Sequence, residues 1–366
     1  MKLLSFQEAI KQAGSYNKKN LLLGNGFSIA CVPTIFTYTS LFKQADFSKM
    51  PEVKEVFKNL NTQDFEEVVK ALEHCSIVLP SYKALPKTVA LIHKHAQKLK
   101  EILIETIAKN HPGRPSDLGE SKYKACIQFL NNFLGNDGVI YSLNYDLLLY
   151  WTLMYGMNEG LLNAQPNDGF GKDVELNDAD IPVSVSDYVI WQGDSNAHGQ
   201  NIHYLHGALH IFEKDAEIEK FTWVNTGKPL IEQTREALEE NRFPLFVAEG
   251  DSKKKLTRIS HSGYLFHSYK SFSTRMKTGD KRSTSCLFTY GVSFSENDEH
   301  IIKKISNGKF NHLFVSIYGN PDSVGNKKII ASVEAIKRKR RNQDFAISYY
   351  DANSANVWGE KNKVEK

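Results

Sequence analysis

The sequence contains few cysteines and no long apolar segment. Its four cysteines lie far apart and form no Cys-x-x-Cys pair, which argues against a zinc ribbon and against a disulfide framework. No apolar stretch reaches the roughly 18–20 residues of a membrane-spanning helix, and the N-terminal segment turns polar too soon for a secretory signal. We therefore expect a cytoplasmic protein without membrane association. The cysteines are Cys31, Cys75, Cys126 and Cys286.

The composition is that of an ordinary globular protein, with 41% hydrophobic and 24% charged residues and no internal repeat or low-complexity linker. We expect a single domain over residues 1–366 with a flexible tail over 358–366. The net charge of +4 is mild, and part of it lies in the basic run Lys337–Arg341, which follows a helical pattern. Cations at a helix C-terminus offset the macrodipole, so a solvated helix end is the simplest interpretation. Contact with nucleic acid or with a partner stays open.

Short apolar runs alternate with helical patterns along most of the chain. The first strand is expected at about residues 20–24 and the second at 139–142, with a helical interval over 36–135 between them. Further strands are expected at 243–248, 286–291, 313–319 and 345–350. This alternation favours a Rossmann-like α/β fold, in which a mainly parallel sheet is flanked by helices and a helical insertion follows the first strand. Ligands of such sheets bind at the carboxyl ends of the strands.

A glycine turn follows the first expected strand, where residues 21–30 read LLLGNGFSIA. Without Cβ atoms, Gly24 and Gly26 can adopt positive φ and let backbone N–H groups approach a phosphate closely. Strand-to-turn glycines also occur in many folds that bind no ligand, so this motif alone is weak evidence for a nucleotide site.

Polar side chains follow the second expected strand, where residues 141–146 read YSLNYD. The amide of Asn144 and the carboxylate of Asp146 can hydrogen-bond sugar hydroxyls or hold a water molecule. Either side chain can instead cap the following helix, a role that contributes about 1 kcal/mol. Both interpretations stay open.

Three histidines lie close together in residues 203–210, which read HYLHGALH. A metal site at His203, His206 and His210 is disfavoured, because a strand places residues three apart on opposite faces and no carboxylate or cysteine completes a ligand set. His206 precedes a glycine at an expected strand end, which suits an exposed general base near neutral pH. A structural histidine is the alternative.

Two later segments carry weaker signals. Residues 288–298 read FTYGVSFSEND, which is typical of a strand, a glycine turn and a polar helix start. This segment can hold an adenosine ribose, or Ser295 and Asp298 can cap the next helix. The lysines of 253–255 can meet a phosphate, but surface solubility is their more common use.

These motifs, in this order, resemble those of the sirtuin-like superfamily, in which a glycine-rich turn, a (T/Q/S)-x-N-x-D segment, a His-Gly pair and a late glycine-serine loop surround NAD. The matching segments are 24–28, 142–146, 206–207 and 291–293. Within the superfamily, the chain looks like bacterial sirtuin-like proteins once grouped as a domain of unknown function. Residues 204–207, residues 246–250 and the pair Tyr264-Leu265 carry this likeness.

The chain departs from sirtuin deacylases in three ways. It lacks their zinc-binding cysteine pairs, it lacks the segment that follows their glycine turn, and no aspartate comes directly after Ser293. These departures speak against protein deacylation. The related bacterial proteins are mostly NAD+ glycohydrolases that deplete NAD+ during phage infection, and the resemblance implies that activity here.

The resemblance also implies roles for individual residues. Asn144 would orient the attacking water and the ribose hydroxyls, His206 would act as general base, and Asp146 would bind ribose or support the site electrostatically. The glycine turn would cradle the pyrophosphate, and Ser293 would lie near the adenosine. The residues expected to contact NAD+ are Gly24, Asn25, Gly26, Phe27, Ser28, Tyr145, Gly207, Gly291 and Ser293. No zinc and no cofactor beyond the substrate NAD+ are expected.

Other functions remain possible from the sequence. One alternative is a binding module that senses NAD+ or ADP-ribose without turnover, and another is an ADP-ribosyltransferase, which breaks the same bond. We recognise no second domain that could sense a phage. We therefore expect control by homo-oligomerisation or by a separate activator protein, such as an ATPase or a nucleotide-sensing subunit.

Overall fold

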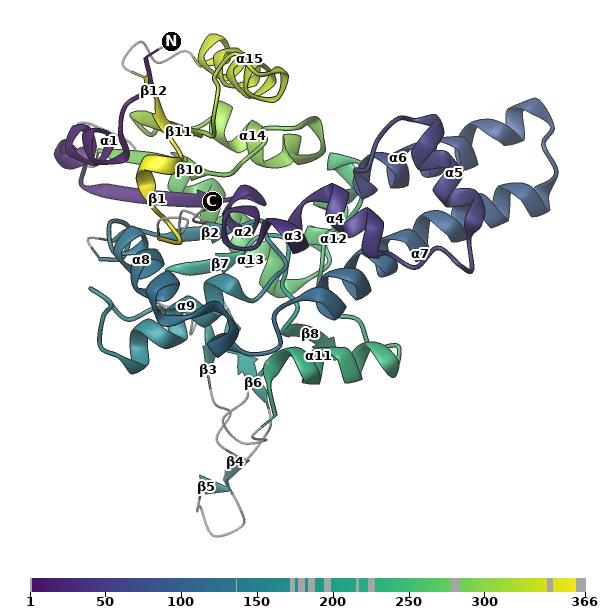
Figure 1. The fold of residues 1–366 in the computed structure, drawn as a ribbon, viewed down its shortest axis with the longest axis horizontal. Helices are drawn as coiled ribbons and strands as arrows, with labels where there is room; N and C mark the ends of the chain where they lie inside the picture. The colour runs from purple at the N-terminus through teal and green to yellow at the C-terminus, as the bar shows by residue number, and fades with distance from the viewer. Residues whose placement is uncertain are drawn as a thin grey trace, which may run out of the picture.

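The computed structural model gives the protein an α/β fold. Its main sheet has six parallel strands in the order β12-β11-β10-β1-β2-β7, and helices flank it (Figure 1). The expected Rossmann-like class is therefore confirmed. The strands are β1 (Lys18–Leu23), β2 (Ile140–Ser142), β7 (Ile202–Tyr204), β10 (Ser285–Tyr290), β11 (His312–Ile317) and β12 (Ala346–Asp351). The structure describes residues 2–135, 137–171, 175–176, 182–183, 188–193, 199–214, 217–222, 228–277, 284–340 and 345–359.

The order of the strands reverses direction between β1 and β10. From β1 the chain adds β2 and then β7 on one side, and it later adds β10, β11 and β12 on the other side. Numbered by their appearance in the chain, these strands run 3-2-1-4-5-6 across the sheet. In doubly wound sheets of this order, ligands bind outside the carboxyl ends of the strands at the point of reversal. Here that point lies between Leu23 and Tyr290, which pair in register.

Helices cover both faces of the sheet. The ring of Tyr141 on β2 packs against Phe272 of α13 (Gly263–Lys277), with ring centroids 5.0 Å apart. On the opposite face, the ring of Tyr290 packs 5.5 Å from Phe129 of α8 (Glu120–Leu130). Parallel strands that are buried on both faces read as nearly continuous apolar runs, which is why the sequence pattern located them.

The helices outside the insertion pack in succession along the sheet. α9 contacts α8, and α12, α13, α14 and α15 form a second contiguous group. α1 lies beside β12. The bounds are α1 (Phe6–Gln12), α9 (Leu148–Asn158), α11 (Leu230–Glu239), α12 (Ser252–Ser260), α14 (Glu299–Ser306) and α15 (Val324–Lys339).

The interval between β1 and β2 is helical, and its helical run begins at Gly26 and ends at Leu130. Two of its helices, α6 and α7, form a long hairpin that projects from the sheet (Figure 1). Ion pairs tie the hairpin to the rest of the molecule, because Glu73 of α6 pairs with Lys254 of α12 and Lys100 of α7 lies 3.7 Å from Glu249. The bounds are α2 (Gly26–Cys31), α3 (Pro33–Phe36), α4 (Tyr38–Gln44), α5 (Pro51–Asn59), α6 (Phe65–Val78) and α7 (Pro86–Asn110).

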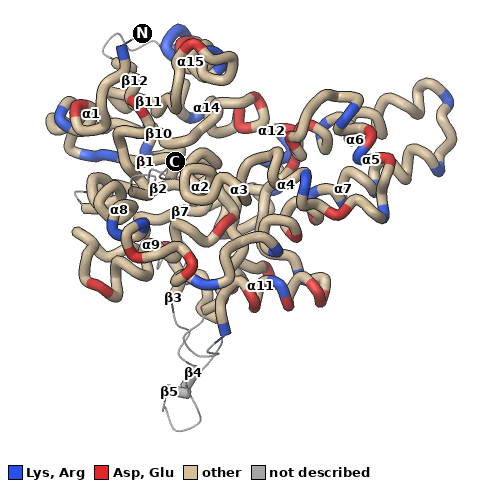
Figure 2. The backbone as a smooth tube through the Cα atoms, in the orientation of Figure 1, with Lys and Arg blue, Asp and Glu red and all other residues tan. Residues whose placement is uncertain are grey.

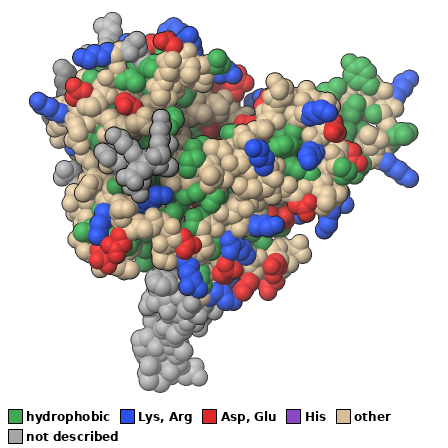
Figure 3. Space-filling view, viewed as in Figure 1, with side chains coloured by type: hydrophobic (Ala, Val, Ile, Leu, Met, Phe, Trp, Pro, Cys, Tyr) green, Lys and Arg blue, Asp and Glu red, His purple; other side chains and the backbone are tan. Residues whose placement is uncertain are grey.

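A small antiparallel sheet, which the sequence analysis did not predict, lies between β2 and α11 in the chain. Its order is β3-β6-β9-β8, and β4 pairs with β5 beside it. Basic and acidic residues are interspersed along the backbone over the whole fold (Figure 2). The far end of the α6–α7 hairpin exposes apolar side chains (Figure 3), among them Ile77, Val78, Tyr82 and Leu85. The strands are β3 (Phe170–Gly171), β4 (Glu175–Leu176), β5 (Pro182–Val183), β6 (Tyr188–Trp191), β8 (Ile211–Lys214) and β9 (Glu217–Phe221).

The strand expected at 243–248 does not form. Within that segment, Phe246 makes one isolated bridge to Gly207, and Val247 accepts a hydrogen bond from the Tyr145 hydroxyl at 2.6 Å. The segment is apolar because it packs into the core beside the end of β7. Leu245 N–H donates to Ile211 O of β8 at 2.6 Å, but the segment does not continue into a strand ladder.

Two expectations near the C-terminus also need correction. Arg340 is buried: its guanidinium donates to Phe310 O at 2.6 Å and stacks on the rings of Phe310 and Phe345, so this part of the basic run is not a solvated helix end. Trp358 is packed as well, and its indole N–H donates to Phe27 O at 2.8 Å. Arg341 and residues 360–366 of the expected tail lie outside the described residues. None of the described helices is long and apolar enough to cross a membrane.

Candidate functional site

A cavity of about 980 Å³ opens at the carboxyl ends of β1, β2, β7 and β10. It therefore lies at the point where the strand order reverses, which is where the fold predicts a ligand. The helical insertion supplies one of its walls through side chains of α3, α4, α6 and α7. Of the residues singled out from the sequence, the cavity is lined by Gly24, Asn25, Gly26, Asn144, Tyr145, Asp146, His206, Gly291 and Ser293.

The two glycine turns after β1 and β10 hold each other at the floor of this cavity. Gly24 N–H donates to Tyr290 O at 2.9 Å, and Gly26 N–H donates to Gly291 O at 3.0 Å. A Cβ atom on Gly26 would lie 2.5 Å from the Cα of Gly291, which real Cβ atoms do not tolerate. These glycines are thus required for close packing of the two turns. Their N–H groups are already hydrogen-bonded, so they do not provide the phosphate cradle that the sequence suggested.

Asn144 is joined to the glycine turn by its side chain. Its Nδ2 donates to Gly24 O and to Ser28 Oγ, each at 3.0 Å, and Ser28 Oγ in turn donates to Asp146 Oδ2. The amide does not cap α9, so the capping alternative fails for Asn144. This network holds the Asn144 side chain in one orientation at the wall of the cavity.

Asp146 does act as a helix-terminal acceptor. Its Oδ1 accepts a hydrogen bond from Leu148 N–H, at the first residue of α9, at 2.9 Å. Burial raises the pKa of Asp146, while the hydrogen bonds from Ser28 and Leu148 act in the opposite direction. The capping alternative therefore describes part of what this carboxylate does.

Three of the expected NAD+ contacts lie outside the cavity lining. Ser28 is fully buried and turned toward Asp146, because α2 begins at Gly26 and places Ser28 on its inner side. Phe27 packs against Trp358 with ring centroids 4.8 Å apart. Gly207 has φ +81°, and a Cβ there would lie 1.9 Å from Leu245 O. All three residues pack behind the residues that line the cavity and do not face its interior.

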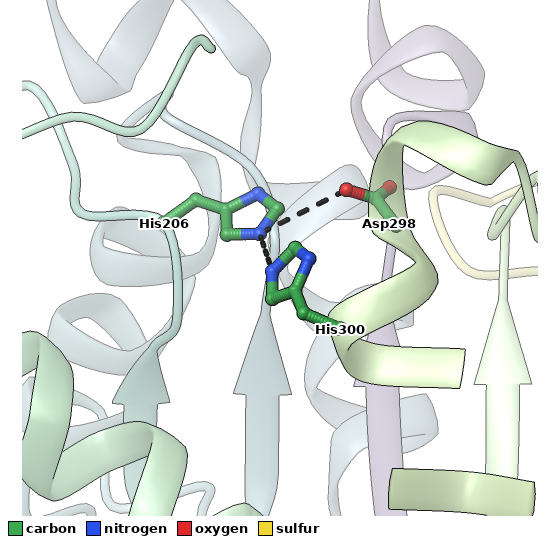
Figure 4. A group of neighbouring side chains, drawn as sticks. All are labelled: His206, Asp298 and His300. Atoms are coloured by element: carbon green, nitrogen blue, oxygen red, sulfur yellow. Dashed lines mark hydrogen bonds and ion pairs between the residues drawn. The ribbon is translucent and has the colours of Figure 1, made fainter. Parts of the chain in front are cut away.

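His206 lies beside two residues that come from the start of α14. Its Nε2 lies 3.1 Å from Nε2 of His300 and 3.9 Å from Oδ1 of Asp298 (Figure 4). The expectation of an exposed base is wrong, because His206 is only 2% exposed. Burial lowers the pKa of His206 well below its ordinary value, and the nearby Lys255 ammonium acts in the same direction. The imidazole is therefore neutral at physiological pH.

A buried lysine with two carboxylates forms the most strongly charged part of the cavity. Lys255 Nζ donates to Glu66 Oε2 at 2.8 Å and to Asp298 Oδ1 at 2.9 Å, and Lys255 is only 1% exposed. The lysine is thus an interior cation, not the surface residue that the sequence suggested. Neither Ser295 nor Asp298 makes a side-chain cap, so the capping alternative fails for both.

The two carboxylates that share Lys255 titrate very differently. Burial raises the pKa of Glu66 to about 7, against the influence of Lys255, and the neighbouring negative charge of Asp298 adds to the rise. For Asp298, burial also favours the neutral form, but the attraction of Lys255 outweighs it and lowers the pKa to about 2. Sequence analysis missed Glu66 altogether, because nothing in the local pattern of α6 separates it from the solvated Glu67 beside it.

Among the described residues, the side-chain atoms of His206, Asp298 and His300 lie within 4.8 Å of one another and could converge on a metal ion (Figure 4). The Lys255 ammonium already occupies Oδ1 of Asp298, the anionic member of this group. A divalent cation would therefore have to enter beside an existing positive charge. The other two histidines of the motif lie apart from it: His203 bonds Ser268 and Ser271, and His210 is buried against Tyr150.

The loop after β10 faces the cavity on its other side. Gly291 has φ +67°, and its N–H donates to Ser316 Oγ at 3.0 Å. Ser293 lines the cavity beside it. Tyr145, after β2, also lines the cavity and is oriented by its hydrogen bond to Val247. The residues picked from four separate segments of the sequence are thus brought together around one space.

Comparison with known proteins identifies a family, but it assigns no activity. No curated protein matches the sequence. A family profile described as a domain of unknown function, DUF4917, matches residues 21–358. This span runs from β1 to Trp358 and includes nearly all of the cavity lining. The protein therefore belongs to the DUF4917 family.

Proposed function

We propose that the protein is an NAD+ glycohydrolase, which cleaves the bond between nicotinamide and ribose and releases nicotinamide and ADP-ribose. The observation that carries the proposal is that Asn144 and His206, from two different strand ends, line one cavity at the point of strand reversal. Cavities for small molecules have volumes of roughly 300–1,000 Å³. The 980 Å³ found here is at the upper end of that range and suits a dinucleotide.

The reaction needs no general acid, but it needs a general base in a fixed position. Loss of nicotinamide leaves positive charge on the ribose, in a transition state like that of glycoside hydrolysis. Nicotinamide departs with the bonding electron pair as a neutral group and needs no proton. Water then bonds to the anomeric carbon, and its proton must pass to a base.

His206 and Asn144 suit the two remaining roles. A neutral His206 can accept the proton of the attacking water, and Asp298, 3.9 Å away, would then stabilise the imidazolium. The fixed amide of Asn144 can orient that water or the ribose hydroxyls. Asp146 supports the arrangement indirectly, through Ser28.

The test is to incubate the purified full chain with NAD+ and to follow nicotinamide and ADP-ribose by chromatography. Asn144→Ala and His206→Ala, each checked for an intact fold by circular dichroism, should release no nicotinamide above background. Full activity in both folded variants would refute the assignment of the pair. If the wild-type protein binds NAD+ but releases no nicotinamide even when plausible partner proteins are present, the sensor alternative is favoured.

An ADP-ribosyltransferase differs only in the acceptor. With labelled NAD+, a hydrolase leaves the label in free ADP-ribose, whereas a transferase leaves it on protein or nucleic acid. The depletion of NAD+ as an anti-phage defence, and its control by self-association or by an activator protein, are supported by the resemblance alone. They predict that the isolated chain is poorly active, and robust activity of a purified monomer would contradict that control.

A further inference from the structure

We propose that Glu66 and Asp298, which share Lys255, form a subsite for a positively charged ring, so that the cavity favours an oxidised, pyridinium-bearing dinucleotide over its neutral reduced form. The inference rests on the proposed function and extends it to a part of the cavity that no motif of the sequence assigned.

The three residues meet at the cavity from three separate elements. Glu66 is the second residue of α6, Lys255 lies on α12, and Asp298 comes directly before α14. All three line the cavity. The side chains of Glu66 and Asp298 are 15% and 18% exposed, whereas that of Lys255 is 1% exposed. The carboxylates are thus the accessible part of the cluster, and the cation lies behind them.

The cluster of Glu66, Asp298 and Lys255 has one more negative charge than positive charge. Two carboxylates against one ammonium leave a net charge of −1 when both are ionised. The adjacent rings of His206 and His300 add no positive charge, because burial lowers the pKa of each. An uncompensated charge in a partly buried site attracts an opposite charge far more strongly than it would in water.

The rest of the cavity lining differs in charge from this end, apart from Asp146, whose carboxylate already accepts hydrogen bonds from Ser28 and Leu148. Among the described lining residues, Lys255 is the one lysine or arginine, so the pyrophosphate of a dinucleotide finds no cationic side chain there. The side near β11 and the C-terminal segment is lined instead by neutral polar groups. These groups include Ser316, Tyr318, Asn326, Asn353 and Asn356. A ligand that is cationic at one end and anionic in the middle is therefore oriented with its cationic end toward Glu66.

A purely structural ion-pair cluster would not need this surplus. α6 is already fastened to α7 and α12 by Glu73, whose carboxylate pairs with Lys100 and with Lys254 away from the cavity. Glu66 adds a second carboxylate to a lysine that Asp298 already neutralises. That excess is hard to explain by packing and follows directly from binding a cation.

The reaction itself indicates which kinetic quantity changes. The positive charge is on the ring in bound NAD+ and moves to the ribose in the transition state, so the total charge near the cluster stays the same. An interaction of equal strength in both states affects KM more than kcat. Glu66→Gln should therefore raise KM for NAD+ several-fold while kcat changes by less than about threefold.

Binding is best measured without turnover. In the full chain with Asn144→Ala, we would titrate NAD+, NADH and ADP-ribose by calorimetry at pH 8 and pH 6, with and without Glu66→Gln. At pH 8 the parent should bind NAD+ at least tenfold tighter than NADH. Glu66→Gln should reduce that ratio to threefold or less, and the affinity for ADP-ribose, which lacks the ring, should change less than twofold. Glu67→Gln, at the exposed neighbouring position of α6, serves as the matched control.

The pH dependence gives a second readout that needs no substitution at the cluster. Since the pKa of Glu66 is raised to about 7, the preference for NAD+ over NADH should be smaller at pH 6 than at pH 8. The titratable groups that act on Glu66 or are acted on by it are Tyr38, Asp64, Tyr145, Lys255 and Asp298. Of these, Lys255, Asp298 and the tyrosines keep one charge state over this interval.

The outcomes separate this inference from the proposed function. Absence of ADP-ribose binding in both the folded parent and the wild-type chain overturns both. Binding of ADP-ribose with equal affinities for NAD+ and NADH, or a ratio that Glu66→Gln leaves unchanged, overturns the subsite alone. If Glu66→Gln does not fold, Glu66→Asp, which keeps the charge, should retain the preference, and a ratio in the parent that does not change with pH would refute the inference.

Discussion

The Lys255 ammonium holds two carboxylates inside the cavity, so replacing it tests the electrostatics of the site directly. In Lys255→Met the apolar stem keeps its volume while the positive charge is lost. Removing one partner of a buried ion pair costs about 3–5 kcal/mol, because the remaining charge stays buried without compensation. With an unfolding entropy of about 2.1 cal/mol/K per residue, the 366 residues should then melt about 4–6 °C lower.

The loss should depend on pH in a defined direction. Without the ammonium, the carboxyl groups of Glu66 and Asp298 have folded-state pKa values above their unfolded-state values. Such groups bind more protons in the folded state, so stability falls as pH rises through that interval. In the wild type, Lys255 instead lowers the pKa of Asp298 to about 2, a contribution to stability that is present above the unfolded-state pKa and is lost in the variant. The destabilisation should therefore be larger at pH 8 than at pH 5.

Thermal melts followed by circular dichroism at both pH values would measure this effect. Lys253→Met, at an exposed position of α12, is the matched control and should melt within about 1 °C of the wild type. Adding Glu66→Gln and Asp298→Asn to Lys255→Met should restore more than half of the lost stability. A Lys255→Met melting temperature equal to that of the control at pH 8, or a larger loss at pH 5, would show that the charge assignment is wrong.

Three further predictions follow from the packing and the ligands of the cavity. Gly207→Ala should lower the free energy of unfolding in urea by more than about 3 kcal/mol, because the new Cβ would lie 1.9 Å from Leu245 O and φ is +81°. Gly14→Ala is the control: a Cβ there has nothing within 4 Å, so the free energy of unfolding should change by less than about 0.5 kcal/mol. A chelator should leave NAD+ cleavage unchanged, because Lys255 already neutralises Asp298; loss of activity that added zinc restores would refute this. His206→Ala should lower the rate of nicotinamide release by at least about 100-fold, the usual effect of a general base, and a smaller effect in a folded variant would exclude that role.

The class of fold was predictable because burial leaves a direct trace in composition. Strands covered on both faces are apolar over their whole length, and the helices between them repeat their apolar residues at helical spacing. The order of the strands left no such trace. Whether β10, the next strand of the main sheet, joins beside β7 or beside β1 depends on contacts such as that between Gly26 and Gly291, which join residues 265 positions apart.

The predicted part of the site followed from the same logic. Asn144 and His206 come directly after buried strands, so a parallel sheet places them at one edge. Their environments were not predictable in the same way. His206 was expected to be exposed, but His300 at the start of α14 packs against it. No local sequence pattern predicts that contact.

Glu66 shows most clearly where sequence reasoning stops. It lies on α6, whose buried apolar face includes Val68, Val69 and Leu72, and by that pattern a glutamate between them and the N-cap is an ordinary polar residue. Its position in the cavity is decided by how α6 lies against the segment between α11 and α12. There, a Cβ on Gly250 would come within 2.3 Å of Glu66 O, so the two backbones touch where any side chain would separate them.

This arrangement makes the cavity a shared product of the sheet and the helical insertion. The sheet alone supplies Asn144 and His206, but the wall that carries the negative charge depends on α6 being docked against α12. Docking and charge are coupled, because the same Lys255 that binds Asp298 also binds Glu66. A displacement of the hairpin would therefore remove a wall of the cavity and a carboxylate in one step, which leaves the lysine to be neutralised by Asp298 alone. The proposed cationic-ring subsite requires the insertion to be in place, so the proposal couples ligand preference to the position of the hairpin.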